Sequence, residues 1–524
     1  MLKLFPPYRP GLLNALIERA LRPNTFEELF STAQQTLRGY SALSVAHEAL
    51  NAMRSGGNDR RKNLEAFPWI SCALLKWRLE IPGKNDVGAR ISTAEFDRLR
   101  QMVWDWNHME EAKEALKSRF NLMTMVRSGL VMQSELQKAE RSDIYRWPAL
   151  LEELPSDHRL RRYFREIFRM EPTVYMDVTM AIFAIAAAHP EGFSRGDLAA
   201  LRPAYGDAVD IVLDQLASDL DGLRQDLANS PPNKRRRRTE VTEFPFLKRR
   251  PLLKLLPDRF TFWNRSVLYC GIEEAVHLRL SDLAGDYAKP FGSVFEKYVW
   301  RLLREAGIPF FDENELKRQV GAESRVVEAV VEGPRGNVFI EAKMGLFADI
   351  PMGTDDPREL STKLDKVLEA CKQGWAVSKL VRSAQLSVGN CANAECDFLL
   401  VVTSREVYVG GGRTLDAMLS PYGPKPEPGG DEYLPLENIF VLGIDQFELL
   451  LAYVRTAEIS IGEVLRDAAR ANSDSKTARL FFWDHIKERG MVELAAFPSQ
   501  LVEDAKEHSA TRLIRALDMS GASL

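Results

Sequence analysis

Cysteine is scarce in this sequence, and long apolar runs are missing. The five cysteines among 524 residues form no dense framework, which argues against the disulfide-stapled class of small secreted domains. The longest strongly apolar run, at 178–188, is shorter than the roughly 20 residues that a helix needs to cross a bilayer. The opening MLKLFPPYRP also lacks a charged segment followed by an apolar secretory core. We therefore expect a cytoplasmic protein that does not enter a membrane.

Several familiar signatures of chemistry are missing as well. The 7 histidines are scattered singly, and none belongs to an H-E-x-x-H motif or a Ser/His/Asp constellation. The glycines at 410–412 are not followed by the Lys-Ser/Thr pair of a nucleotide-binding loop. Cys391 and Cys396 have the spacing of a zinc half-site, but no second Cys/His pair follows them. We interpret these two cysteines as free thiols.

The composition is typical of a globular protein with several domains. Hydrophobic residues make up 45% of the chain and charged residues 27%, which is far from the disordered and fibrous classes. The length predicts about two to four domains. Because the formal net charge is only −4, any contact with phosphate must come from a local basic patch, and the overall charge neither indicates nor excludes nucleic acid.

The first part of the chain has helical periodicity, and we expect an α-helical domain over residues 1–230. A helix start is indicated by Ser92 with Glu95 three residues later, the spacing of a capping box. No repeat of fixed period occurs, so a solenoid is not supported.

Residues 178–265 fit a winged-helix-like segment, with three helices followed by a hairpin in RPLLKLLPDRFTFWN. The helix that would enter a DNA groove is rich in carboxylates, and a phosphate-lined groove repels them. These residues are Asp207, Asp210, Asp214, Asp219 and Asp221. We therefore expect a structural role for this segment.

A basic linker or loop is expected over residues 229–250. It contains five consecutive positive charges next to a Pro/Ser-rich breaker, namely Lys234, Arg235, Arg236, Arg237 and Arg238. Three interpretations stay open. The run is a solvated linker, an arm that contacts nucleic-acid phosphates, or a localisation or protein-docking signal.

After residue 290 the pattern becomes that of an α/β domain, which we place at 290–456. We expect helices at 295–306, 357–382 and 445–456, strands at DFLLVVTS and NIFVLGI, and a hairpin within VVEAVVEGPRGNVFIEAKMG. A further strand would lie around 308–311. The remaining segment, 457–524, is again mostly helical.

The hairpin places three charged side chains on one face. If Gly333 to Gly336 form the turn, Glu328 lies opposite Glu341, and Lys343 emerges on the same side because strand side chains alternate. The other face shows only apolar side chains and is expected to be the core: Val327, Ala329, Val331, Val338, Ile340 and Ala342.

Two directly opposed carboxylates repel each other, so a cation is expected between them. Mg²⁺ prefers carboxylate oxygens and keeps several waters, which suits Glu328 and Glu341 together with substrate phosphate oxygens; Mn²⁺ is an alternative. Lys343 could polarise a hydroxide and offset negative charge in a transition state. The preceding helix adds Glu296, which borders its apolar stripe and can face the sheet.

Together, a helix glutamate, a hairpin acid and the E-x-K of Glu341-Ala342-Lys343 resemble the PD-(D/E)xK (restriction-endonuclease-like) nuclease superfamily over roughly residues 290–456. The resemblance implies an αβββαβ core, metal binding by Glu328 and Glu341, assistance to the attacking water by Lys343, and support from Glu296. The superfamily usually has Asp where this chain has Glu328. It often has Gln or Lys on the next helix, where Lys366, Lys372 and Gln373 are equally placed.

The tripeptide alone carries little information, because E-x-K or D-x-K also begins at Glu111, Glu315, Asp474 and Asp504. With its context, it predicts a Mg²⁺-dependent nuclease, an endonuclease or related phosphodiesterase that acts on DNA. A role in bacterial antiviral defence or DNA processing is expected only by analogy with stand-alone nucleases that carry large helical extensions. The partners are then nucleic acid and, in addition, other proteins or a second copy of the chain. The alternative is a non-catalytic nucleic-acid-binding or assembly subunit with a degenerate site.

Overall fold

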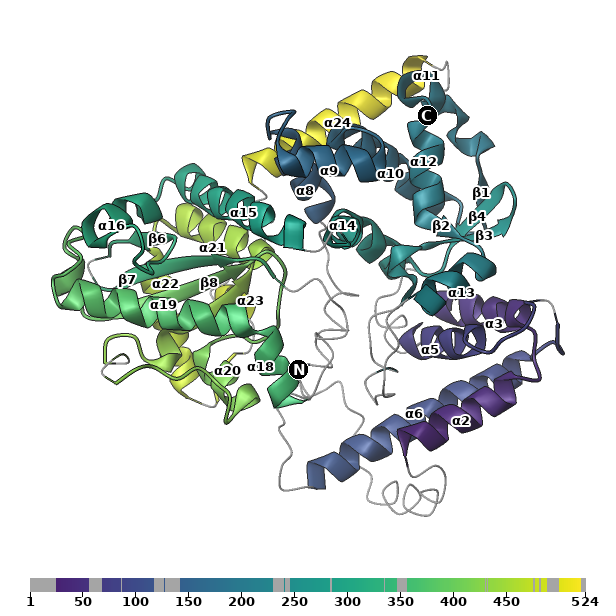
Figure 1. Ribbon diagram of the computed structural model, residues 1–524, viewed down its shortest axis with the longest axis horizontal. Helices are drawn as coiled ribbons and strands as arrows, with labels where there is room; N and C mark the ends of the chain where they lie inside the picture. The colour runs from purple at the N-terminus through teal and green to yellow at the C-terminus, as the bar shows by residue number, and fades with distance from the viewer. Residues whose placement is uncertain are drawn as a thin grey trace.

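The computed structural model of the chain describes residues 25–55, 68–85, 87–116, 127, 142–229, 240, 246–282, 285–333, 335–345, 356–428, 430, 432–474, 476–479, 482–487 and 499–519. Within these ranges the chain is mostly helical and contains two small mixed sheets (Figure 1). The expected combination of α and α/β parts is confirmed at this level. The basic run at 234–238 lies outside the described residues.

The helices nearest the N-terminus share one hydrophobic core. They are α2 (Phe26–Leu37), α3 (Ala42–Arg54), α5 (Pro68–Leu79) and α6 (Thr93–Leu116). The backbone N–H of Ser92 donates to the Glu95 carboxylate (3.2 Å) and that of Glu95 donates to the Ser92 hydroxyl (3.3 Å), which confirms the predicted helix start. Leucines of α13 (Leu220–Asn229) and η4 (Phe246–Arg249) complete this core.

A second group of helices carries the smaller sheet. The helices are α8 (Asp143–Glu152), α9 (Arg159–Phe168), α10 (Pro172–Ala188), η2 (Gly196–Leu201), α11 (Arg202–Tyr205), α12 (Ala208–Leu216) and α14 (Arg265–Ser281). In the described residues the sheet order is β1-β4-β3-β2, where β3 (Leu252–Leu256) and β4 (Arg259–Phe262) form the expected hairpin. Residues 1–230 are not wholly helical, because β1 (Phe193–Ser194) and β2 (Ala217–Ser218) join this sheet. Strands this short leave no readable alternation in a sequence.

The larger sheet has the order β5-β6-β7-β8-β9 in the described residues. Its strands are β5 (Phe311–Asp312), β6 (Ala329–Val331), β7 (Asn337–Lys343), β8 (Asp397–Thr403) and β9 (Ile439–Gly443). The pairs β5/β6 and β6/β7 are antiparallel, whereas β7/β8 and β8/β9 are parallel. Val330 pairs with Phe339, and the Gly336 N–H donates to the Gly333 carbonyl (3.2 Å), so the predicted turn and register are confirmed.

Both faces of this sheet are buried. Helices α15 (Gly285–Glu305) and α21 (Ile444–Ala457) cover one face, and α19 (Asp365–Arg382) covers the other (Figure 1). The expectation of a core on one face was therefore incomplete. Val327 was also placed on the wrong side, since it packs in the α19 core and not with Ala329. It precedes β6, where no ladder enforces alternation.

The helices around this sheet differ from the prediction in four places. Helix α20 (Gly412–Leu419), which packs in the α19 core, was not expected. Helix α16 (Glu313–Val320) was not expected, although Asp312 and Glu315 form a capping box at its start. The helix expected at 357–382 is broken at Leu364 into α18 (Pro357–Lys363) and α19. Helix α15 begins at Gly285, ten residues before the expected start at 295.

The C-terminal segment is helical, as expected, and it packs back onto the N-terminal half. It contains α22 (Ile461–Ser473), α23 (Phe482–Lys487) and α24 (Gln500–Met519), and α24 lies along α8 and α10 (Figure 1). Arg512 of α24 donates to both carboxylate oxygens of buried Asp177 on α10 (2.6 and 2.8 Å). The segment therefore does not stand apart as a tail.

No single helix in the described ranges is both long and apolar enough to cross a membrane. The bent pair α9–α10 passes the same test of length and composition when its two helices are taken together. Its apolar side chains, including Phe164 and Ile182, are buried in the protein core.

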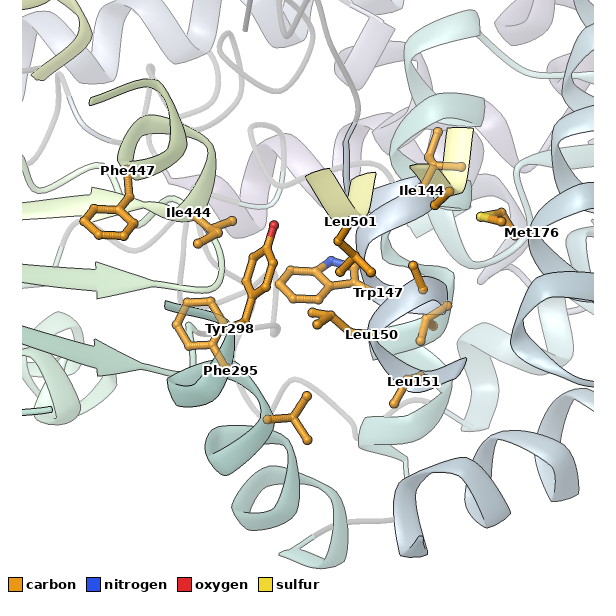
Figure 2. Packing of buried hydrophobic residues seen from close by; sticks show 14 of the residues in the cluster. Ile144, Trp147, Leu150, Leu151, Met176, Phe295, Tyr298, Ile444, Phe447 and Leu501 are labelled. Carbon is orange, nitrogen blue, oxygen red and sulfur yellow. The ribbon is translucent and has the colours of Figure 1, made fainter. Parts of the chain in front are cut away.

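A buried polar hub joins the two halves of the chain. Arg146 of α8 donates to both carboxylate oxygens of Glu448 on α21 (3.2 and 2.9 Å) and to Asp445 (2.7 Å). Tyr298 of α15 donates to Glu448 and lies 2.7 Å from the Ser499 hydroxyl next to α24. Figure 2 shows Tyr298 beside Trp147 and Leu501, in the apolar packing that surrounds this hub.

Replacing Arg146 with alanine should lower the free energy of unfolding by about 3–5 kcal/mol, because Glu448 would stay buried without its partner. Urea unfolding followed by tryptophan fluorescence measures the change. The control is Arg249→Ala, which removes an exposed pair with Asp282 and should cost about 0–1 kcal/mol. Equal losses in the two variants would show that the hub contributes no more than a surface pair.

Candidate active site

Glu328 and Glu341 lie opposite each other at the end of the β6–β7 hairpin. Ala329 pairs with Ile340, and one further step in this register brings Glu328 to Glu341. Both side chains are withdrawn from solvent, with Glu341 at 0% and Glu328 at 7% exposure. The predicted pairing of two carboxylates is present, and it is buried.

The backbone of Glu328 is held by two helices. Its carbonyl oxygen accepts a hydrogen bond from the Glu313 N–H at the start of α16 (3.0 Å) and another from the indole Nε1 of Trp300 on α15 (3.0 Å). The Glu313 N–H and the Trp300 indole therefore both hold the Glu328 peptide, and they fix the point from which its side chain leaves the backbone.

Lys343 completes the group on the same strand. It forms an ion pair with one oxygen of Glu341, two residues earlier, and its side chain keeps a small solvent-exposed fraction of 17%. Alternation along β7 accounts for this contact, since residues two apart share a face. One end of the ion pair is therefore buried, whereas the ammonium reaches the surface.

Glu296 approaches from α15, one helical turn before Trp300. Its carboxylate is half-buried, and burial together with the charge of Glu313 raises its pKa. The charge of Glu296 in turn contributes to the raised pKa values of Glu328 and Glu341. The structure thus brings together all four residues expected at the site: Glu296, Glu328, Glu341 and Lys343.

The two opposed carboxylates are strongly perturbed. Burial raises the pKa of Glu328 to about 9, and repulsion from Glu341 and Glu296 adds to this effect. Burial also raises the pKa of Glu341 to about 7, against the opposing influence of Lys343 and of a backbone hydrogen bond from Glu328. Glu328 therefore retains its proton at neutral pH unless another positive charge arrives.

The carboxylate pair fits a small oxygen-seeking cation. One oxygen of each side chain, Oε2 of Glu328 and Oε2 of Glu341, is buried without a hydrogen-bond partner. Among the described residues, no group of three or more His, Cys, Asp or Glu side chains is arranged to hold a metal. An ion here would have two protein ligands and take water and substrate oxygens for the rest, which is a common environment for Mg²⁺.

Four neighbours of this site were missed by the sequence reasoning. Glu313 and Lys317 of α16 form an ion pair on the Glu296 side. On the α19 side, a hydrogen bond from Lys366 lowers the pKa of Glu369, and the charges of Lys343 and Arg325 add to this effect. The capping box that begins at Asp312 was a readable signal for the α16 pair. Nothing in the sequence indicated Arg325 or Glu369, because their proximity depends on how α19 packs.

Two other sequence interpretations concern cysteines and the basic run. All five cysteines are free, and Cys391 and Cys396 form no disulfide. The proposed nucleic-acid contacts at 234–238 fall outside the described residues, so they stay a prediction.

Comparisons of the chain with known protein families, with curated proteins and with solved structures returned no match.

The wild-type protein should lose stability as the pH rises from about 5 to about 9 in the absence of metal. A carboxyl whose pKa is raised on folding keeps a proton that the unfolded chain releases, so folding becomes less favourable as that proton is lost. Glu328→Gln removes the Glu328 contribution to this dependence, whereas Glu341 keeps its own, and should stabilise the protein at pH 8 by on the order of 1–3 kcal/mol.

Urea unfolding at pH 5 and pH 8 in EDTA tests this expectation. The control is Glu323→Gln, which changes an exposed carboxylate in the same segment and should leave the pH dependence unchanged. A Glu328→Gln variant with the wild-type pH dependence would contradict the assignment.

Proposed function

We propose that this chain is a Mg²⁺-dependent nuclease that hydrolyses phosphodiester bonds, with DNA as its foremost substrate. The observation that carries the proposal is the buried pair Glu328–Glu341, which has an unpartnered oxygen on each side chain and a lysine beside it. Residues 290–456 would then form the restriction-endonuclease-like domain. The order of α15, β5, β6, β7, α19 and β8 supports an αβββαβ core.

Each side chain has a definite task in this proposal. Glu328 and Glu341 would hold the cation, which when bound would supply Lewis-acid stabilisation of charge on the phosphate oxygens. Lys343, whose ammonium reaches the surface, donates hydrogen bonds to the attacking water and offsets the negative charge of the transition state. Glu296 supports the pair from α15. Mn²⁺ has similar ligand preferences and would serve in place of Mg²⁺.

The protonation states give the site a further property. Glu328 must lose its proton before it can ligate a cation, and its pKa of about 9 opposes that loss at neutral pH. Cation binding should therefore release protons and become tighter as the pH rises. A role in bacterial genome defence or DNA processing stays a prediction by analogy.

Lys343→Ala and Glu341→Ala should each lower Mg²⁺-dependent cleavage by at least about 100-fold, the scale on which transition-state stabilisation by one donor acts. Purified protein is incubated with plasmid, linear DNA and RNA, in Mg²⁺ and in EDTA. The matched control is Lys506→Ala, which changes the lysine of an unrelated D-x-K tripeptide on α24. Cleavage that survives in the Lys343 or Glu341 variant would remove this site from consideration.

Mg²⁺ should also stabilise the folded protein, by about 1–3 kcal/mol at concentrations ten to a hundred times the dissociation constant. The measurement is thermal unfolding during a Mg²⁺ titration at pH 7 and pH 9, with a larger shift at pH 9. Glu341→Gln should abolish the shift and Glu323→Gln should not. A wild-type protein that neither cleaves nor gains stability from Mg²⁺ fits the alternative, a non-catalytic binding or assembly subunit.

A further inference from the structure

A cleft of about 470 Å³ opens on the α19 side of the large sheet. Its lining comes from α18, α19, the segment before β6 and the chain after α20 (Gly412–Leu419). This volume lies within the roughly 300–1,000 Å³ typical of small-ligand sites. Its lining includes Arg325, Thr362, Asp365, Glu369, Lys372 and Tyr422.

The cleft is next to the candidate active site. Arg325 precedes Val326, whose carbonyl oxygen accepts a hydrogen bond from the Gln373 amide of α19 (3.4 Å). Arg325 lies three positions before Glu328, so their α-carbons are at most roughly 10–11 Å apart. The charge of Lys343 also acts on Glu369, which lines the cleft. A strand whose phosphate sits at Lys343 would therefore place a nearby nucleotide at the cleft.

The lining of the cleft combines two cations, two carboxylates and one aromatic ring. Glu369 accepts a hydrogen bond from Lys366 (2.9 Å), and the Asp365 carboxylate accepts one from the Lys366 N–H (2.8 Å). The Thr362 hydroxyl donates to the Arg358 carbonyl (3.1 Å). In contrast, Arg325 and Lys372 are exposed and have no ion-pair partner in the part of the chain that the structure describes.

Tyr422 supplies a planar apolar surface at the rim. Its side chain is 46% exposed, which is unusual for a large aromatic residue beside a cleft. A nucleobase stacks on such a ring only through its face, and in a duplex that face is covered by neighbouring bases. The exposed side chains of Arg325 and Lys372 and an open tyrosine therefore suit an unpaired nucleotide better than a double helix.

We propose that this cleft binds an unpaired nucleotide next to the scissile phosphate, with its base on Tyr422 and its phosphates at Arg325 and Lys372. The inference rests on the proposed nuclease function and makes it more specific, since the preferred substrate becomes a single strand or a single-stranded end. DNA and RNA strands share the bases and phosphates that the cleft would contact. The experiment below therefore compares the two kinds of strand.

The test is the binding of fluorescein-labelled oligonucleotides to the full chain in EDTA, followed by fluorescence anisotropy. The probes are a single-stranded DNA, an RNA of the same sequence and the DNA duplex. Tyr422→Ala should weaken single-strand binding about 5- to 100-fold, the range measured for loss of one stacked base, with a much smaller change for the duplex. Tyr422→Phe keeps the ring and should bind within about twofold of the wild type.

The matched control is Tyr433→Ala, because Tyr433 is also exposed but stacks on Arg382 outside the cleft lining. Arg325→Gln and Lys372→Gln should each lower the salt dependence of single-strand binding by a slope of about 0.7. Unchanged binding by Tyr422→Ala, or equal losses for single strand and duplex, would overturn the proposal.

These outcomes separate the cleft from the catalytic site. If the wild-type protein binds single strands through Tyr422 but cleaves no nucleic acid in Mg²⁺, the proposed cleft is supported and the proposed nuclease activity is rejected. If the protein cleaves nucleic acid but Tyr422→Ala leaves single-strand binding unchanged, the nuclease activity is supported and the proposed cleft is rejected.

Discussion

The site depends on one unfavourable arrangement, the burial of two carboxylates directly opposite each other on neighbouring strands. Burial of an ionised carboxylate is costly, and like charges across a ladder add to that cost. Lys343 neutralises one charge of the pair, so Glu328 keeps a proton in the absence of a cation. Such a pair persists only where the surrounding fold fixes the strands strongly enough to prevent it from turning outward to water. At this position the fold does so with β8 on the far side of β7 and with two helices that hold the Glu328 peptide.

Helix α15 links that arrangement to the rest of the chain. Trp300 on this helix donates to the Glu328 carbonyl, and one turn earlier Glu296 faces the same carboxylates. Tyr298, between them, reaches into the polar hub with Glu448 and Arg146. Because the hub also includes α8 and the residue preceding α24, the N-terminal half and the C-terminal helix determine where α15 lies. The N-terminal half and Ser499 therefore help to position the helix that carries Trp300 and Glu296.

Sequence reasoning located the site because it needed only local geometry. The hairpin register follows from counting outward from the Gly333–Gly336 turn, and the alternation of side chains then places Glu328, Glu341 and Lys343. The position of Glu296 follows from helical periodicity. What the sequence could not supply was packing between distant segments. Whether one or both faces of the sheet are buried depends on where α19 packs, and the sequence of α19 does not predict that position. Arg325 and Glu369 were missed for the same reason. The break at Leu364 and the two-residue strands β1 and β2 likewise leave no periodic signal.

Among the described residues, α12 and the α19 cleft differ in how their charged side chains are paired. On α12, the helix of the winged-helix-like segment, Asp210 and Asp214 pair with Arg195, and Asp210 also pairs with Arg202. Because Arg195 and Arg202 form ion pairs with carboxylates of α12, this helix presents little unpaired positive charge to a phosphate backbone. At the α19 cleft, the carboxylates are satisfied by Lys366 and by helix N–H groups, and the cations stay available. Since phosphate contacts provide much of the affinity for nucleic acid, the proposed function would place a strand at the surface beside Glu341 and Lys343, whereas α12 packs against α10 in the N-terminal half.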